Sequence, residues 1–162
     1  MMKRRGIGAA AALMMLLAAC TPAKPAGGAD PIELGQAMVQ AAADLPGMSV
    51  VTSADERGEE LFPYLSDLDY GKVDGYYFAY AEAGTAEEIA VIRLKDPADA
   101  EEAKASLTRH VRDRQGIFEV YDPAQVVLVK QAQVLTSGVM VALVICGEPG
   151  PAETAFRQGC GS

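Results

Sequence analysis

One cysteine near the start of the chain has the clearest setting for chemistry. Cys20 follows Leu17, Ala18 and Ala19 at the end of an uncharged, mostly apolar run of about 13 residues, and three basic residues precede that run. The run is shorter than the roughly 20 residues that a membrane-spanning helix needs. Its basic and apolar regions are those of a signal peptide. The small residues Ala18 and Ala19 before Cys20 suit cleavage by a peptidase between Ala19 and Cys20.

This tetrapeptide resembles a bacterial lipobox, in which the cysteine thiol receives a diacylglycerol and becomes the new N-terminus after cleavage. The resemblance implies Cys20 as the lipidation site, and it divides the chain into three parts. Residues 1–19 are the predicted lipoprotein signal peptide. Residues 20–30 are the lipidated cysteine and a flexible tether, because Pro, Ala and Gly dominate their composition. Residues 31–160 are long enough for one domain with one core. Lipidation predicts a place on the extracytoplasmic face of the cell membrane, anchored through the lipid on Cys20. An ordinary signal peptide with a chance cysteine near its cleavage site is the alternative.

The charge of the chain restricts its partners. It carries 14 Lys and Arg against 22 Asp and Glu, a formal charge of −8, and removal of residues 1–19 brings this near −11 because three basic residues leave with them. Nucleic acids are bound through Lys and Arg that contact phosphate, so the composition excludes them as the expected partner. It also argues against a basic patch on anionic lipid. An acidic surface keeps a protein soluble, and an acidic recognition face is the alternative.

Three alternating acids raise the question of a cation site. Asp67, Asp69 and Asp74 lie in a short segment with a glycine. An EF-hand loop that opened at Asp67 would have Gly, Lys and Phe at its fifth, sixth and twelfth positions, none of which suits that loop. Turn chemistry of Asp and Gly accounts for the segment without a metal. We assign no metal site here, and whether these three acids bind a cation stays open.

No arrangement of residues predicts catalysis. His110 is the only histidine, which excludes zinc sites built on a histidine pair; we expect a half-exposed helix residue without a role. The acids Asp55, Glu56, Glu59 and Glu60 suit the first turns of a helix. Paired carboxylates also serve glycoside hydrolysis, but the chain has no Trp on which a sugar would stack. No motif predicts a cofactor.

Helix starts are legible in the sequence. Asp30-Pro31 and Asp96-Pro97 each place an N-cap acid before a proline, which suits the first helical position. A capping-box spacing at Ser53 and Glu56 predicts a shorter helix. The predicted helices begin at residue 31, cover 53–63, run over 97–115 with an end at Gly116, and cover 149–158.

Strands are expected between these helices, over residues 76–83, 88–94, 126–136 and 139–146. Gly84-Thr85 predicts a hairpin between the first two. The last strand is apolar on both faces, so we place it centrally with cover on each side. The predicted fold class is α+β: a four-stranded antiparallel sheet in β-β-α-β-β-α order with an additional N-terminal helix, in two layers.

Several segments in this order resemble a known family. They are the lipobox, Asp44–Met48, Ala86–Asp96, Tyr121 before Val127–Lys130, and Gly138 with the strand that follows. Together they resemble the bacterial lipoprotein family catalogued as domain of unknown function 4358, over about residues 31–158, with the largest departure at 53–75. The resemblance implies a secreted, membrane-tethered domain, common in Gram-positive anaerobes, with no established activity. It implies no catalytic residues.

We therefore expect a lipid-anchored, non-enzymatic binding or interaction module at the cell envelope, with an envelope protein or component as its partner. One alternative is an envelope-acting hydrolase that uses carboxylates, and another is a small-molecule receptor for a transporter. Carboxylates that converge in a deep pocket would favour an enzyme, and an exposed apolar or aromatic patch would favour binding. The exposed tyrosines of Tyr76–Tyr80 are where we expect such a face.

Overall fold

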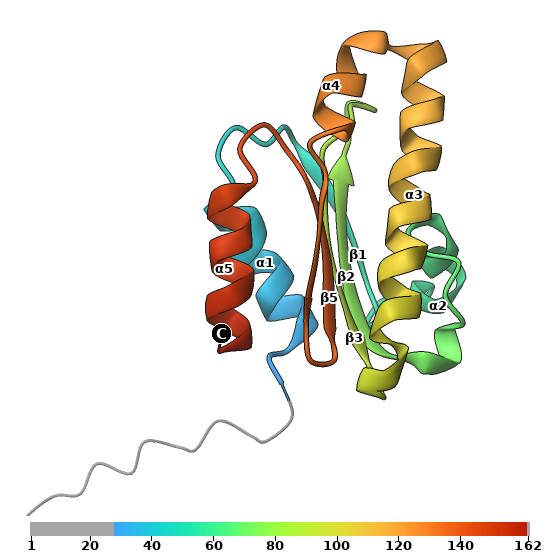
Figure 1. The fold of residues 1–162 in the computed structure, drawn as a ribbon, viewed down its shortest axis with the longest axis vertical. Coiled ribbons are helices and arrows are strands. Elements are labelled where there is room, and N and C mark those ends of the chain that lie inside the picture. Colours follow the sequence, from blue (N-terminus) through green and yellow to red (C-terminus); the bar gives the residue numbers. More distant parts are fainter. Residues whose placement is uncertain (1–27, 162) are drawn as a thin grey trace, which may run out of the picture.

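Within residues 28–161, which the computed structural model describes, a five-stranded antiparallel sheet forms the middle layer (Figure 1). Neighbouring strands pair antiparallel, and their order is β1-β2-β3-β5-β4. The strands are β1 (Met48–Thr52), β2 (Val73–Ala81), β3 (Glu88–Leu94), β4 (Gln133–Ser137) and β5 (Met140–Ile145). β1 and β4 are therefore the two edges. The predicted cleavage and lipidation positions, Ala19 and Cys20, lie outside the described residues.

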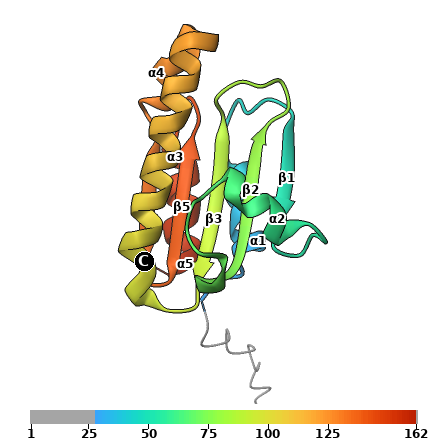
Figure 2. The same ribbon diagram turned by 90° about the vertical axis from the view of Figure 1, so that its right-hand side faces the viewer.

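Helices cover both faces of the sheet (Figures 1 and 2). α1 (Pro31–Ala41) and α5 (Gly150–Cys160) lie side by side on one face, and α3 (Ala100–Tyr121) runs along the other. The shorter helical segments are α2 (Gly58–Leu61), α4 (Val126–Val129) and the 3-10 turns Phe62–Tyr64, Tyr70–Lys72, Pro97–Asp99 and Pro123–Gln125. The fold is thus a three-layer α+β arrangement.

This architecture confirms an α+β fold with an antiparallel sheet and corrects two details of the prediction. The described part of the chain has five strands instead of four, because β1 precedes the predicted set. β1 is a short edge strand of five residues. It is formed through its pairing with β2, and its own sequence pattern does not indicate a strand. The helices also form layers on both faces instead of one. Both faces of the inner strands are apolar and need cover.

The Asp-Pro signals behave as capping physics requires. Asp30 accepts hydrogen bonds from the backbone of Ile32 at 2.8 Å and Glu33 at 3.1 Å, which starts α1 at Pro31. Asp96 caps the 3-10 turn that leads into α3. α3 does not end at Gly116 as predicted, but continues to Tyr121. A glycine inside a helix costs only about 1 kcal/mol relative to alanine, and the turns on either side outweigh that loss.

The predicted strand 126–136 is wrong in its first half. Asp122 accepts a hydrogen bond from the backbone of Ala124 at 3.2 Å, and Pro123 follows it. This is the Asp-Pro start seen at the other two helices, and it directs the apolar residues of α4 into helix. Strand structure begins only at Gln133. A run of β-branched residues favours a strand, but the cap before it prevails here.

Two apolar cores lie on the two sides of the sheet. One, against α3, includes Phe62, Tyr76, Ile92, Leu107, Phe118 and Leu143. The other, against α1 and α5, includes Leu34, Met38, Ile89, Val91, Val144 and Phe156. All six residues of β5 are buried, and β5 lies between β3 and β4. This confirms an inner strand covered on each side.

The helices cover the two faces unequally, and this difference creates the site described next. On one face α1 contacts β2 and β3 while α5 contacts β4 and β5. On the other face α3 contacts β4 and β5, and α2 lies near one end of β1 and β2 (Figure 2). Part of β1 and β2 is therefore left without a helix over it. Among the described residues, none of the helices combines the length and apolarity that a membrane crossing requires.

Candidate functional site

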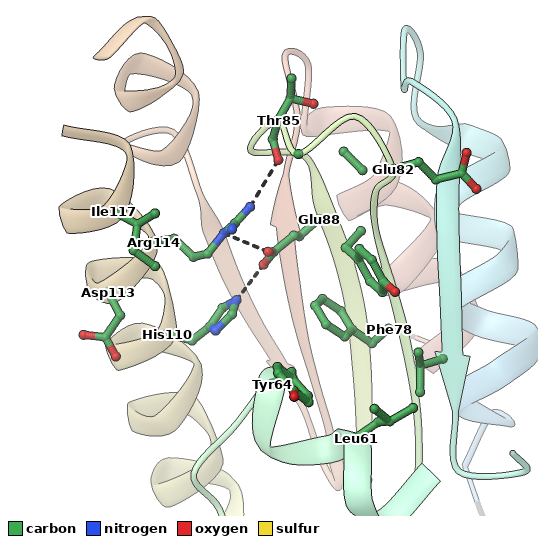
Figure 3. Close-up of a pocket in the computed structure, with 14 residues that line it drawn as sticks. Leu61, Tyr64, Phe78, Glu82, Thr85, Glu88, His110, Asp113, Arg114 and Ile117 are labelled. Atoms are coloured by element: carbon green, nitrogen blue, oxygen red, sulfur yellow. Dashed lines mark hydrogen bonds and ion pairs between the residues drawn. The ribbon is translucent and has the colours of Figure 1, made fainter. Parts of the chain in front are cut away.

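A cleft of about 650 Å³ lies between α3 and the uncovered part of β1 and β2 (Figure 3). Its floor comes from the sheet, and one wall comes from α3. One end, at the bottom of Figure 3, is closed by Leu61 of α2 and Tyr64 of the 3-10 turn after it. The residues that line it are Val51, Leu61, Tyr64, Phe78, Tyr80, Ala81, Glu82, Gly84, Thr85, Glu88, His110, Asp113, Arg114 and Ile117.

A buried carboxylate lies at the inner side of the cleft. Glu88 opens β3, and its side chain is only 3% exposed. Its Oε2 lies 2.6 Å from Nε2 of His110, and its Oε1 lies 2.8 Å from Nε of Arg114. His110 and Arg114 are four residues apart on α3, so helical periodicity places both on one face. An unpaired charge would be costly at this depth; the guanidinium of Arg114 supplies the opposite charge, and His110 adds a hydrogen bond.

The same arginine extends the network to the hairpin between β2 and β3. A terminal nitrogen of Arg114 donates to the backbone carbonyl of Thr85 at 3.1 Å (Figure 3). The guanidinium also lies over the ring of Phe118, 4.7 Å from its centroid. Both oxygens of Glu88 are therefore engaged, and Arg114 is held by three different groups. The network joins α3 to the start of β3 and to the hairpin before it.

Exposed apolar and aromatic side chains surround this network. The exposed fractions are 73% for Tyr64, 37% for Tyr80 and 55% for Ile117. The ring of Phe78 contacts that of Tyr80, with centroids 5.3 Å apart, and lies edge-on to His110 at 6.3 Å. Tyr80 is the one exposed tyrosine of the segment 76–80, where the sequence predicted a binding face, and Tyr76 and Tyr77 are buried. The cleft thus combines an apolar lining with a compensated polar group at its inner side.

Two further carboxylates stand at the margins of the cleft. Asp113 is on α3, and Glu82 follows β2 on the other side (Figure 3). Glu82 accepts a hydrogen bond from the Ser49 hydroxyl at 3.3 Å. Among the described residues, neither acid forms an ion pair within 4.0 Å. With Glu88, the cleft has three carboxylates against the single guanidinium of Arg114, so its margin is acidic.

The three acids considered for a cation do not converge. Asp74 accepts from Nε of Arg93 at 2.6 Å, and Asp69 accepts from the backbone of Gly71 at 2.9 Å, where it caps a 3-10 turn. Within residues 28–161, no three His, Cys, Asp or Glu side chains are grouped as a metal site would require. These two acids thus have structural partners.

Asp67 fastens the loop after α2 to α3. It accepts from Arg109 at 2.9 Å and 2.7 Å and from the Ser106 hydroxyl. Ser106 is buried and also contacts the hydroxyl of Ser66 at 2.6 Å. Hydrogen bonds from Arg109 and Ser106 lower the pKa of Asp67 to about 2. This carboxylate is therefore charged and has a structural role, because it connects the loop to α3.

The structure also corrects the interpretation of His110 and leaves the acidic cluster outside the cleft. His110 is largely buried, with 13% of its side chain exposed, and bonds Glu88. In the cluster, Asp55 accepts from the backbone of Thr52 at 2.6 Å, and Glu60 pairs with Arg57 at 2.7 Å. The cluster residues do not line the cleft.

Sequence analysis missed Glu88 and Arg114 as site residues. A weak signal exists for Glu88, because the residues that follow it in the strand are apolar on both faces. An acid at the start of such a strand is expected to be buried and therefore to need a partner. The i,i+4 spacing of His110 and Arg114 offers one. Nothing in the sequence joins the two segments, which lie more than 20 residues apart.

Comparison with known proteins gives one match. The sequence model of a family described as Domain of unknown function (DUF4358) matches residues 51–146. The match begins in β1 and ends just after β5, so it contains every residue of the Glu88 network. No curated protein and no solved structure shows a significant match to the chain.

Proposed function

Because the chain belongs to the DUF4358 family, whose function is unknown, we propose its function from the cleft: a non-enzymatic binding domain that holds a protein partner at the cell envelope. The observation that carries this proposal is the exposed apolar and aromatic lining of the cleft. Tyr64 and Ile117 are more than half exposed, and exposed apolar groups that gather in one place mark interaction sites. Tyrosine is favoured at interfaces, because its ring is apolar and its hydroxyl is polar.

The polar groups of the cleft support binding over hydrolysis. Each carboxylate oxygen of Glu88 already has a partner, His110 or Arg114, and the side chain is only 3% exposed, which suits a structural role better than attack on a substrate. Glu82 and Asp113 lie on opposite sides of the cleft (Figure 3). The described lining residues include neither Ser nor Cys, and the one aliphatic hydroxyl among them is that of Thr85. The imidazole held by a carboxylate, His110 with Glu88, is the one feature that favours the hydrolase alternative.

The anchoring part of the proposal rests on the N-terminal sequence. The apolar run before Cys20 and the Pro- and Gly-rich residues after it suit a lipid on this cysteine and a tether to the domain. The first helix begins at Pro31, which leaves about ten residues between the lipid and the fold. We propose that the domain is held on the extracytoplasmic face of the membrane in this way.

Site-specific photo-cross-linking in the native envelope tests the proposal. A photoreactive phenylalanine analogue replaces Tyr64 in the cleft or, as a control, Glu101, an exposed residue in the first turn of α3. We expect a polypeptide adduct from position 64, its loss when Ile117→Asp is added, and no such adduct from position 101. No adduct at position 64, or an adduct that Ile117→Asp leaves intact, would overturn the proposal. Turnover of an envelope substrate that His110→Gln abolishes would establish the hydrolase instead.

A further inference from the structure

The uncovered part of the sheet corresponds in position to the part that a helix, α1, covers on the opposite face. On the opposite face, α1 lies against β2 and β3 and α5 lies against β4 and β5. On the face of the cleft, α3 takes the position over β4 and β5, and the position that corresponds to α1 is filled only at one end, by α2 (Figure 2). Phe78 and Val51 form the floor at this vacant position. An added helix beside α3 would complete the layer.

The apolar face of α3 extends beyond the cleft. Asp113, Arg114 and Ile117 line the cleft. Val120 and Tyr121 follow Ile117 by three and four residues, so they lie on the same side of the helix. Their exposed fractions are 89% and 78%. From Asp113 to Tyr121 the helix rises about 12 Å at ~1.5 Å per residue. A contact surface of that length suits a segment of polypeptide better than a compact small molecule.

The charges at the margin of the cleft indicate which charged side chains a bound segment should carry. Glu82 and Asp113 stand on the two sides of the cleft without an ion pair among the described residues, and Arg114 is already engaged by Glu88 and Thr85. Positive groups on an incoming segment would pair with both margins. A second copy of this chain would bring the same carboxylates and a net charge of −8 against them. Like charges disfavour that occupant.

We propose that the cleft receives an amphipathic helix of a partner protein, with apolar side chains on its buried face and Lys or Arg at its edges. This rests on the proposed binding function and adds the class of ligand. The helix lies beside α3, its apolar face on Phe78, Tyr80 and Ile117, in the helix-in-groove mode of recognition. Its basic side chains reach Glu82 on one side and Asp113 on the other.

A set of designed peptides tests the inference on the mature chain from residue 20 onward, which contains every described element. Cys20→Ser keeps that chain free of lipid, so that no detergent competes for the peptide. The first fluorescent peptide is an 18-residue amphipathic helix with Leu on one face and Lys at the edges. The second has the same composition in scrambled order, and the third has Glu in place of Lys. Fluorescence anisotropy at low and high salt measures the affinity of each.

We expect the Lys helix to bind at least about tenfold more tightly than either other peptide, and less tightly at high salt. Asp113→Asn and Glu82→Gln should each weaken it roughly two- to fivefold, as exposed ion pairs do. The matched control Glu101→Gln removes the same charge from α3 outside the cleft and should leave the affinity unchanged. Ile117→Asp should weaken binding at least about tenfold. Tyr64→Ala serves the same purpose if that variant fails to fold.

The outcomes separate this inference from the proposed function. Equal binding of the Lys and Glu helices, both sensitive to Ile117→Asp, would overturn the charge assignment and leave the cleft as a binding site. Equal effects of Glu101→Gln and Asp113→Asn would show attraction to the acidic surface as a whole and overturn the helix in the cleft. A photo-adduct from position 64 without binding of any peptide would overturn the helix and keep the function. If there is neither a photo-adduct from position 64 nor binding of any peptide, both the helix and the proposed function are overturned.

Discussion

Individual polar side chains connect α3 to distant parts of the chain. Asp67 is one of them, and its contribution to stability can be measured as a function of pH. Its pKa of about 2 is below the ordinary value of 3.8 because Arg109 and Ser106 donate to the carboxylate. The charged form is therefore preferred in the folded protein. The stability that this preference contributes is present above about pH 4 and is lost as the pH falls through about 2. The side chain is 61% exposed, so solvent screening keeps the contribution near or below about 1 kcal/mol.

Asp67→Asn should consequently lower the free energy of unfolding by about 1 kcal/mol at pH 6 and by much less near pH 2. Urea denaturation at several pH values measures the difference between the variant and the wild type. Arg109→Gln is the matched change on the other side of the pair. It should produce a similar loss at pH 6, and the double variant should add little to either single one. A difference between Asp67→Asn and wild type that stays constant down to pH 2 would contradict this account.

At the scale of single residues, the sequence showed which side chains are acidic but not which residues they contact in the fold. Asp69 and Asp74 were visible as acids, yet their engagement by Gly71 and Arg93 follows from chain geometry. Glu88 was visible as an acid in an apolar strand, and its burial depends on α3, whose contact residue His110 lies 22 positions later. The exposed Tyr80 was the one site residue that composition pointed toward, because tyrosines are favoured at interfaces whatever the fold.

At the scale of elements, two glycines within helices allow opposite predictions. Gly35 of α1 lies against β2, where an added Cβ would stand 2.8 Å from Cβ of Tyr77. Gly116 of α3 has open space around the same position. Gly35→Ala should therefore lower the free energy of unfolding by about 1–3 kcal/mol through overpacking. Gly116→Ala should raise it by about 0.5–1 kcal/mol, because alanine suits a helix interior better.

Thermal and chemical denaturation of the two variants measure these changes. Because both variants make the same chemical substitution in a helix, the opposite signs isolate the contact between α1 and β2 from helix propensity. A gain in stability for Gly35→Ala would show that α1 lies farther from Tyr77 than the structure places it. A loss for Gly116→Ala would show that the end of α3 is not helical around that residue.

The elements themselves divide into those that local chemistry determines and those that pairing determines. α1 and α3 start where an acid precedes a proline, and this local signal was sufficient. The same signal stands at Asp122 but was not used in the prediction, which followed the apolar run after it. β1 had no comparable signal, since a five-residue edge strand depends on its partner β2 for its hydrogen bonds.

At the scale of the whole molecule, the cleft results from an unequal distribution of helices over the sheet. Only the strand 139–146 was recognised as apolar on both faces, and the predicted fold still had two layers instead of the three that the structure shows. Which strands remain uncovered does not follow from the sequence, because it depends on where α3 crosses the sheet. The lining of the cleft comes from α2 and its following turn, β1, β2, β3 and α3, and only the assembled fold brings these segments together.

The proposed anchor determines how this assembled domain meets its partner, and it gives the last prediction. If Cys20 carries the lipid, the protein expressed in a bacterium should enter the detergent phase, and its N-terminus should be an acylated Cys20. Cys20→Ser should release it from the membrane or leave residues 1–19 attached. Cys160→Ser, at the end of α5, is the matched control and should leave partitioning unchanged. Mass spectrometry of the N-terminal peptide decides the question: an unmodified terminus at another residue would exclude the anchor, and the cleft would then have to recruit its partner without help from the membrane.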